Sequence, residues 1–159
     1  MDGLKTIFAR NCSVARIGKA ACDAFLQENH RLGSTGGRYR YALFVERSTG
    51  ASEDAGPGEG AMVAVALFSN ARRWKKDGGV VSSYEWIRYC SLRGYRVVGG
   101  MSRLLRHFIA EVGPDDIMSY ADADYPDGGD VYATLGFVAE GEVVRGGHRN
   151  IKYRLVLHR

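Results

Sequence analysis

Three consecutive segments decide the fold: SYEWIRYCSL (Ser83–Leu92), RVVGGMSRLLRHFIA (Arg96–Ala110) and DDIMSYAD (Asp115–Asp122). The first alternates its side chains with a period of two, which is typical of a strand with two distinct faces. The second combines a glycine pair with a helical stripe of apolar residues. The third predicts another strand, parallel to the first if the connection is a right-handed crossover.

The glycine pair in the second segment predicts an anion site. The first backbone N–H groups of a helix have no partner within the helix, and the helix dipole adds partial positive charge there. A pyrophosphate suits such a position. We expect the contacts to come from the amides of Val98, Gly99, Gly100, Met101 and Ser102.

These segments resemble the GNAT acyltransferase superfamily. Its cofactor motif places Arg or Gln three residues before a Gly and ends on Gly or Ala; here Arg96 and Gly99 match, and Met101 replaces the final small residue. A second match is Tyr-x-x-Leu-Gly-Phe at Tyr132–Phe137, where the superfamily has its general-acid tyrosine. The resemblance implies a GNAT-like fold, acetyl-CoA or another acyl-CoA as donor, and Tyr132 as the acid.

A longer resemblance, from Phe25 to Phe137, is to phage and prophage proteins related to the Mom-type enzymes. These are GNAT-fold proteins that modify adenine bases in DNA. The matching stretches are FLQENHRLG, WIRYC, VVGGMSRLL and SYADADYPDGGDVYATLGF. This resemblance implies DNA as a partner and a catalytic cluster of His30, Arg88, Asp122 and Tyr132, which we expect to converge on one cleft.

Each of these candidates also has an ordinary structural interpretation. His30 follows a predicted helix, where a lone histidine is usually a capping or surface residue. Asp122 ends a strand and can cap the loop after it, and Tyr132 can be core filler. If Arg88 lies beside Asp122, the Asp122 carboxylate stays ionised and serves to orient the amine. If Asp122 instead pairs with His30, the pair favours base or ligand chemistry. Two ligands are too few to predict a metal.

The segment Asn70–Val80 (NARRWKKDGGV) is predicted to be a basic loop. Cationic side chains around an aromatic ring can hold a phosphate backbone and stack on a base. A solvated loop with one anchoring tryptophan explains the composition equally well. The nucleic-acid-binding candidates are Arg72, Arg73, Trp74, Lys75 and Lys76.

The composition sets limits on the protein class. With 159 residues, 45% of them hydrophobic, the chain suits a single domain over residues 1–159. Its net charge of +4 is compatible with phosphate-bearing partners. Three widely spaced cysteines suggest neither a disulfide framework nor a zinc ribbon. Because no leader-like segment and no long apolar run is visible, we expect a cytoplasmic protein that does not span a membrane.

The remaining patterns predict a short strand, a helix and four further strands. A loop low in apolar residues is expected at Ser48–Gly60. The fold should be a single α/β domain with a mixed, mostly antiparallel sheet of about six or seven strands and helices on both faces. The elements are a strand at Thr6–Arg10, a helix that starts at Ser13 or just after it and ends near Asn29, and strands at Arg38–Arg47, Ala61–Phe68, Phe137–Arg145 and Asn150–His158.

Three functions remain open from the sequence. The first is an N-acyltransferase acting on an amine, with the exocyclic amine of a nucleobase as one acceptor. The second is a nucleic-acid-binding protein with a GNAT fold and no acyl transfer, which Met101 slightly favours. The third is an acetyltransferase for small-molecule or protein amines, which differs from the first only in its acceptor.

Overall fold

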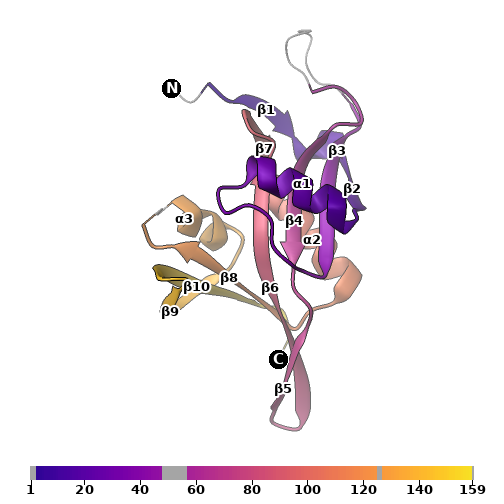
Figure 1. The fold of residues 1–159 in the computed structure, drawn as a ribbon. Helices are drawn as coiled ribbons and strands as arrows, with labels where there is room; N and C mark the ends of the chain where they lie inside the picture. Colours follow the sequence, from indigo (N-terminus) through magenta and orange to yellow (C-terminus); the bar gives the residue numbers. More distant parts are fainter. Residues whose placement is uncertain (1–2, 48–56, 125–126, 159) are drawn as a thin grey trace. The chain divides into compact units, whose positions relative to one another are not determined.

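A computed structural model of the chain describes residues 3–47, 57–124 and 127–158 (Figure 1). The predicted loop at Ser48–Gly60 falls mostly on residues 48–56, which lie outside the described residues. The chain divides into two compact units. The first unit comprises Met1–Phe68 and Arg88–Glu111, and the second comprises Ser69–Ile87 and Val112–Arg159.

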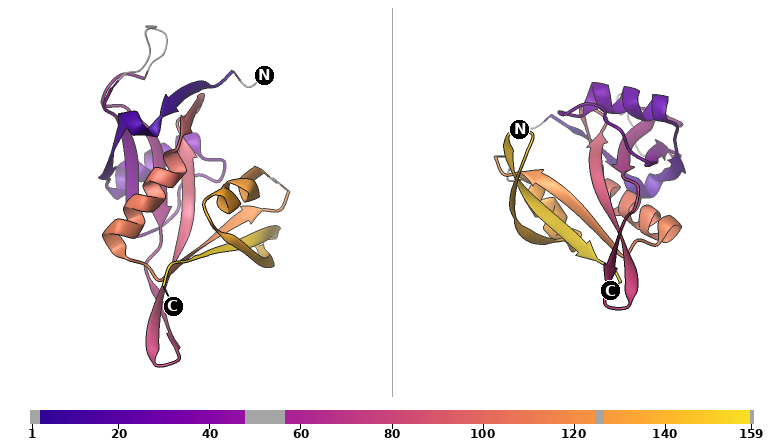
Figure 2. Two further views of the ribbon diagram at one scale, coloured as in Figure 1. Left: turned by 180° about the vertical axis from the view of Figure 1, so that it is seen from behind. Right: turned by 60° about the horizontal axis from the view of Figure 1, so that its bottom comes forward.

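The first unit is built on three antiparallel strands, β2 (Cys12–Arg16), β3 (Tyr39–Val45) and β4 (Met62–Phe68). Strand β4 carries the core, because every residue from Val63 to Phe68 is fully buried. Helices α1 (Lys19–Asn29) and α2 (Gly100–Val112) lie on opposite faces of these strands (Figures 1 and 2). The ring of Phe108 on α2 stacks on Phe68 with centroids 3.9 Å apart.

A two-stranded parallel ribbon also belongs to the first unit. Strand β1 (Lys5–Phe8) pairs with β7 (Tyr95–Val98), residue by residue from Lys5 opposite Tyr95 to Phe8 opposite Val98. A short 3₁₀ turn, η1 (Ala9–Asn11), follows β1, while the glycine pair and α2 follow β7. The pairing therefore places η1 next to the glycine turn.

The second unit contains β5 (Arg72–Lys76), the first part of β6 (Gly79–Ser91), β8 (Asp116–Asp122), α3 (Asp127–Thr134), β9 (Val138–Arg145) and β10 (His148–Val156). Strands β6 and β8 are parallel neighbours, as predicted. Their recorded pairing covers only Ser83–Glu85 opposite Asp116–Met118, although both strands continue beyond it. Strand β10 pairs antiparallel with both β8 and β9.

Strand β6 runs through both units. Within the described residues, eight strands form one sheet in the order β2-β3-β4-β6-β8-β10-β9, with β5 paired to β6. Only the β6–β8 pair among the recorded pairings of this sheet is parallel. The predicted mixed, mostly antiparallel α/β fold is thus confirmed, with more strands than expected. No helix in the described part of the chain is long and apolar enough to span a membrane.

Two element predictions were wrong. The stretch Cys12–Arg16 is strand β2, paired with β3, and the helix begins only at Lys19. The stretch Arg72–Lys76 is strand β5 of a hairpin with β6, whereas a loop was predicted. The hairpin turn has positive φ at Asp77 (25°) and Gly78 (81°), as a type I′ turn requires.

Candidate active site

The glycine turn between β7 and α2 has the backbone geometry of an anion site. Gly99 has a φ of +78°, in the left-handed region that side chains rarely adopt. A Cβ at Gly100 would lie 2.5 Å from Tyr89 Oη, so any larger residue there would force the Tyr89 side chain to move. The first helical bond runs from Arg103 N–H to Gly99 O at 3.0 Å. The amides of Gly100 to Ser102 precede that bond and therefore have no partner within the helix.

A cavity of about 520 Å³ opens beside this turn, within the first unit. Its wall comes from η1 and the end of β1 on one side and from the first two turns of α2 on the other. Three predicted cofactor residues, Val98, Gly99 and Ser102, line it, whereas Arg96 is exposed on β7 and Gly100 is buried beneath. The lining residues are Phe8, Ala9, Arg10, Val98, Gly99, Ser102, Arg103 and Arg106.

Three arginines in this lining were not predicted from the sequence. Arg103 donates from Nη1 to Ala9 O and, at 2.6 Å, to Cys12 O, which fastens the N-terminal segment to α2. The guanidinium of Arg10 lies over the Phe8 ring, 4.4 Å from its centroid. The i, i+3 spacing of Arg103 and Arg106 was a readable signal for one helix face. The position of Arg10 depends on the long-range β1–β7 pairing.

In the second unit, Tyr132 lies where β6 and β8 stop pairing. Ser119 Oγ is 2.9 Å from Trp86 O and 2.7 Å from Tyr132 Oη. Because a carbonyl only accepts and serine has a single hydroxyl proton, Ser119 donates to Trp86 O. Tyr132 must then donate its phenol proton to Ser119 Oγ. The serine hydroxyl thus bridges the two separating strands and orients the phenol.

The environment of Tyr132 keeps its phenol protonated. The ring packs edge-on against Trp86 and Phe137 and stacks on Tyr153, with centroids 5.4 to 6.1 Å away. Burial in this aromatic cluster raises the pKa of Tyr132 above its ordinary value. A protonated phenol is the form that a general acid needs, although packing alone also explains the aromatic ring.

Asp122 ends β8, also in the second unit. It is half-buried, and its Oδ1 accepts a hydrogen bond of 2.9 Å from the N–H of Asp124. This is the local loop-capping role that the sequence offered as the ordinary interpretation.

His30 and Arg88 lie together in the first unit. Leu32 N–H donates to His30 Nδ1 at 2.9 Å, so the neutral ring carries its proton on Nε2. Burial, followed by the charges of Arg88 and Arg31, lowers the pKa of His30 to about 4. Arg88 Nε donates to Gly33 O at 3.1 Å, just beyond the end of α1. His30 is therefore a neutral hydrogen-bond donor near pH 7, which does not favour a role as a base.

Of the four predicted catalytic residues, His30 and Arg88 thus belong to the first unit, and Asp122 and Tyr132 belong to the second. The convergence of all four on one cleft stays a prediction. Across residues 3–47, 57–124 and 127–158, no group of three or more His, Cys, Asp or Glu side chains could hold a metal ion.

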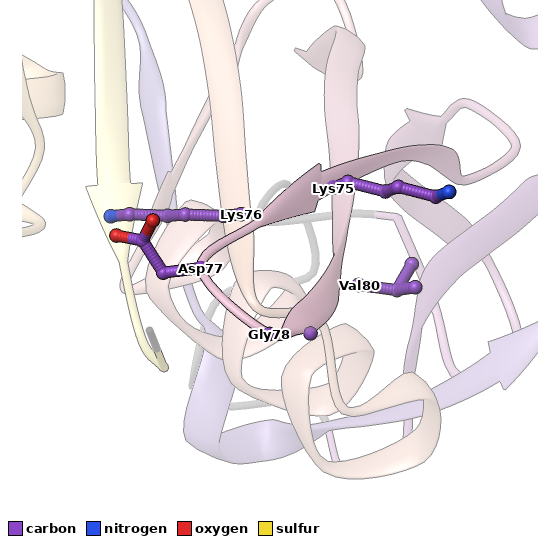
Figure 3. A pocket seen from close by; sticks show the side chains of 6 residues that line it. Lys75, Lys76, Asp77, Gly78 and Val80 are labelled. Carbon is purple, nitrogen blue, oxygen red and sulfur yellow. The ribbon is translucent and has the colours of Figure 1, made fainter.

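The predicted nucleic-acid-binding residues form strand β5, and all five are exposed. Trp74 Nε1 donates to Ser83 Oγ at 2.9 Å, which fixes the indole on one hairpin face. At the tip, around a hollow of about 320 Å³, Lys75 and Lys76 point to opposite sides (Figure 3). None of the four cations of β5 has an ion pair recorded among the described residues.

No protein-family model matches the sequence. No curated protein matches it either. Solved structures of N-acetyltransferases do match, over more than nine tenths of the chain. The fold is that of N-acetyltransferases.

Three of these structures illustrate the likeness. The ribosomal-protein-S18-alanine N-acetyltransferase from Escherichia coli is 16% identical, with a TM-score of 0.61 over 93% of this chain and 95% of its own. NAA60 from Arabidopsis thaliana, in complex with acetyl-CoA, is 9% identical, with a TM-score of 0.64 over 92% and 98%. Spermidine/spermine N-acetyltransferase SpeG from Vibrio cholerae is 8% identical, with a TM-score of 0.62 over 93% and 94%. At these identities the likeness concerns the fold alone.

Proposed function

We propose that this protein is an N-acyltransferase that transfers an acyl group, such as acetyl, from acyl-CoA to an amine. The observation that carries the proposal is the cavity beside the Gly99 turn, which combines unpaired helix amides with three arginines in an N-acetyltransferase fold. The binding of acetyl-CoA by NAA60, a protein of the same fold, supports the choice of donor.

The fit of the donor is supported by residues of this chain. A diphosphate needs hydrogen-bond donors without nearby acids, and the described residues that line the cavity include no Asp or Glu. The exposed Gly99 presents bare backbone to the cavity. Met101 does not line it, so its side chain does not occupy the space proposed for the phosphates.

In the proposed reaction, the amine nitrogen attacks the thioester carbonyl, the C–S bond breaks, the amine loses a proton and the thiolate gains one. Tyr132 supplies the proton to the sulfur, for which its protonated phenol turns the O–H from Ser119 Oγ toward the leaving thiolate. We assign Asp122 to the amine, as an orienting carboxylate or a base. His30, as a neutral donor, and Arg88 would hydrogen-bond the acceptor or the developing oxyanion.

The acceptor that we propose is the exocyclic amine of a nucleobase in DNA. Two features support it: the resemblance of segments around His30, Arg88, Asp122 and Tyr132 to Mom-related proteins, and the exposed cationic strand β5. Small-molecule and protein amines are the alternative acceptors, as in SpeG and the S18-alanine enzyme.

Mass spectrometry of the products tests this function. DNA from cells that express the protein should contain an acylated or otherwise enlarged base, and Tyr132→Phe should reduce its amount about 100-fold or more, the usual contribution of a general acid. Phenylalanine keeps the ring packing, so the comparison isolates the hydroxyl. Unmodified DNA together with release of free CoA in the presence of polyamines or peptides would reject the nucleobase and keep the transferase.

A second candidate function is nucleic-acid binding without acyl transfer. It is favoured by strand β5, whose four cations have no acidic partner recorded among the described residues and whose tryptophan is held in place. Binding of DNA together with a complete lack of response to acetyl-CoA would support this candidate over the first.

A further inference from the structure

The cavity at the Gly99 turn contains more positive charge than one diphosphate requires. Three arginines line it: Arg10 from η1, and Arg103 and Arg106 from α2. No carboxylate is part of the wall, and no ion pair of these arginines is recorded within the described ranges. Guanidinium groups gathered in a hollow without acids repel one another unless an anion lies among them.

The three arginines differ in how they are engaged. Arg103 is committed to the carbonyls of Ala9 and Cys12, so it serves mainly to hold the wall together. Arg10 and Arg106 are exposed, and among residues 3–47, 57–124 and 127–158 the recorded partner of Arg10 is the Phe8 ring. These two guanidinium groups therefore keep donors available for a ligand.

The position of Arg106 indicates a second anionic group. The dipole and free amides of a helix act within its first turn, which suits one phosphate group or diphosphate. Arg106 is six residues after Gly100, or about 9 Å further along the helix axis. Arg10 approaches from the other wall of the same cavity. A ligand that carries a diphosphate and a separate phosphate monoester would use both sets of donors.

We propose that Arg10 and Arg106 bind the 3′-phosphate of the adenosine in coenzyme A. The site then selects free acyl-CoA as the donor over dephosphorylated CoA and over an acyl group on a carrier protein, whose pantetheine arm has one phosphodiester and no adenosine. This inference rests on the proposed function, because it names the donor class of that same site.

Calorimetry with CoA and dephospho-CoA tests the inference on the full chain. The wild type should bind CoA about tenfold to hundredfold more tightly than dephospho-CoA, because charge-assisted hydrogen bonds to the 3′-phosphate contribute that much affinity. Arg10→Gln and Arg106→Gln should each weaken CoA binding and leave dephospho-CoA binding nearly unchanged. Arg47→Gln, an exposed arginine that does not line the cavity, should change neither affinity.

Each other outcome has a distinct meaning. Equal wild-type affinity for the two ligands, or a preference that survives both substitutions, would overturn the 3′-phosphate assignment and keep the proposed donor. No binding of either ligand would overturn both. A single-stranded oligonucleotide that competes with CoA and loses affinity in Arg10→Gln and Arg106→Gln would reassign the arginines to nucleic-acid phosphates.

Discussion

His30 shows how one backbone contact decides what a side chain can do. Its Nδ1 accepts from Leu32 N–H, so in the neutral ring the proton is on Nε2, which is a donor. To act as a base or a metal ligand through Nε2, the ring would have to change tautomer and give up this hydrogen bond. Nitrogen-15 NMR of the imidazole distinguishes the two tautomers directly.

The lowered pKa of His30 predicts a pH dependence of stability. The folded state keeps the ring neutral down to about pH 4, whereas the unfolded chain takes up a proton near the ordinary pKa of 6.5. The unfolded state thus binds more protons in this window, and the contribution of His30 to the free energy of unfolding falls as pH drops from about 6.5 to about 4. Urea denaturation across this range, compared with His30→Gln, isolates the contribution. If the free energy of unfolding changes with pH in the same way in the wild type and in His30→Gln, the predicted contribution of His30 is wrong.

Arg103 is expected to matter for folding more than for binding. Truncation to alanine removes both hydrogen bonds to the carbonyls of the buried residues Ala9 and Cys12, so Arg103→Ala should lower the free energy of unfolding by about 1 to 3 kcal/mol. Arg106→Ala, one turn further along the same helix and exposed, should change it by less than about 0.5 kcal/mol. Equal losses in urea denaturation would mean that the Arg103 contacts do not stabilise the fold.

The hairpin of β5 and β6 is the element for which structure changed the interpretation most. Strand alternation puts Arg72, Trp74 and Lys76 on one face and Arg73 and Lys75 on the other. The sequence signal for the hairpin was Asp77-Gly78, a common pair for a type I′ turn. The charged residues before it lack the apolar alternation of a half-buried strand, because β5 is exposed on both faces.

These two faces make the nucleic-acid proposal testable with matched charge losses. The double variants Arg72→Ala/Lys76→Ala and Arg73→Ala/Lys75→Ala each remove two cations. Only the first pair lies on the same hairpin face as Trp74. If phosphates and a stacked base share that face, the first variant should bind single-stranded DNA more weakly and lower the slope of log affinity against log salt by up to about 0.7 per lost contact. Fluorescence anisotropy at several salt concentrations measures both. Unchanged binding in both variants would exclude the hairpin.

Helix α1 illustrates a different failure of local signals. Ser13 and the alanines after it suit a helix start, yet Cys12–Arg16 forms five residues of antiparallel pairing with β3. Tertiary pairing overrides intrinsic propensity in such cases. The glycine turn was predictable, in contrast, because Gly99 and Gly100 are required by backbone geometry and by the contact with Tyr89.

For the whole molecule, the sequence was sufficient for the fold and for the glycine turn of the proposed cofactor site. The parallel neighbours β6 and β8 and the turn at Gly99 followed from period and glycine chemistry. Arg10 was not predictable, since it reaches the cavity only through the pairing of chain positions about 90 residues apart.

The proposed joint action of His30 with Tyr132 can be examined by a double-mutant cycle of His30→Asn and Tyr132→Phe on turnover, in which coupled residues give non-additive losses.

The central claim is that the cavity beside Gly99 binds acyl-CoA, and calorimetric titration with acetyl-CoA tests it most directly. We predict saturable binding with one site per chain and a melting temperature that rises with ligand concentration, because a ligand that binds only the folded state stabilises it. Absence of both heat and a thermal shift at saturating acetyl-CoA would contradict the account.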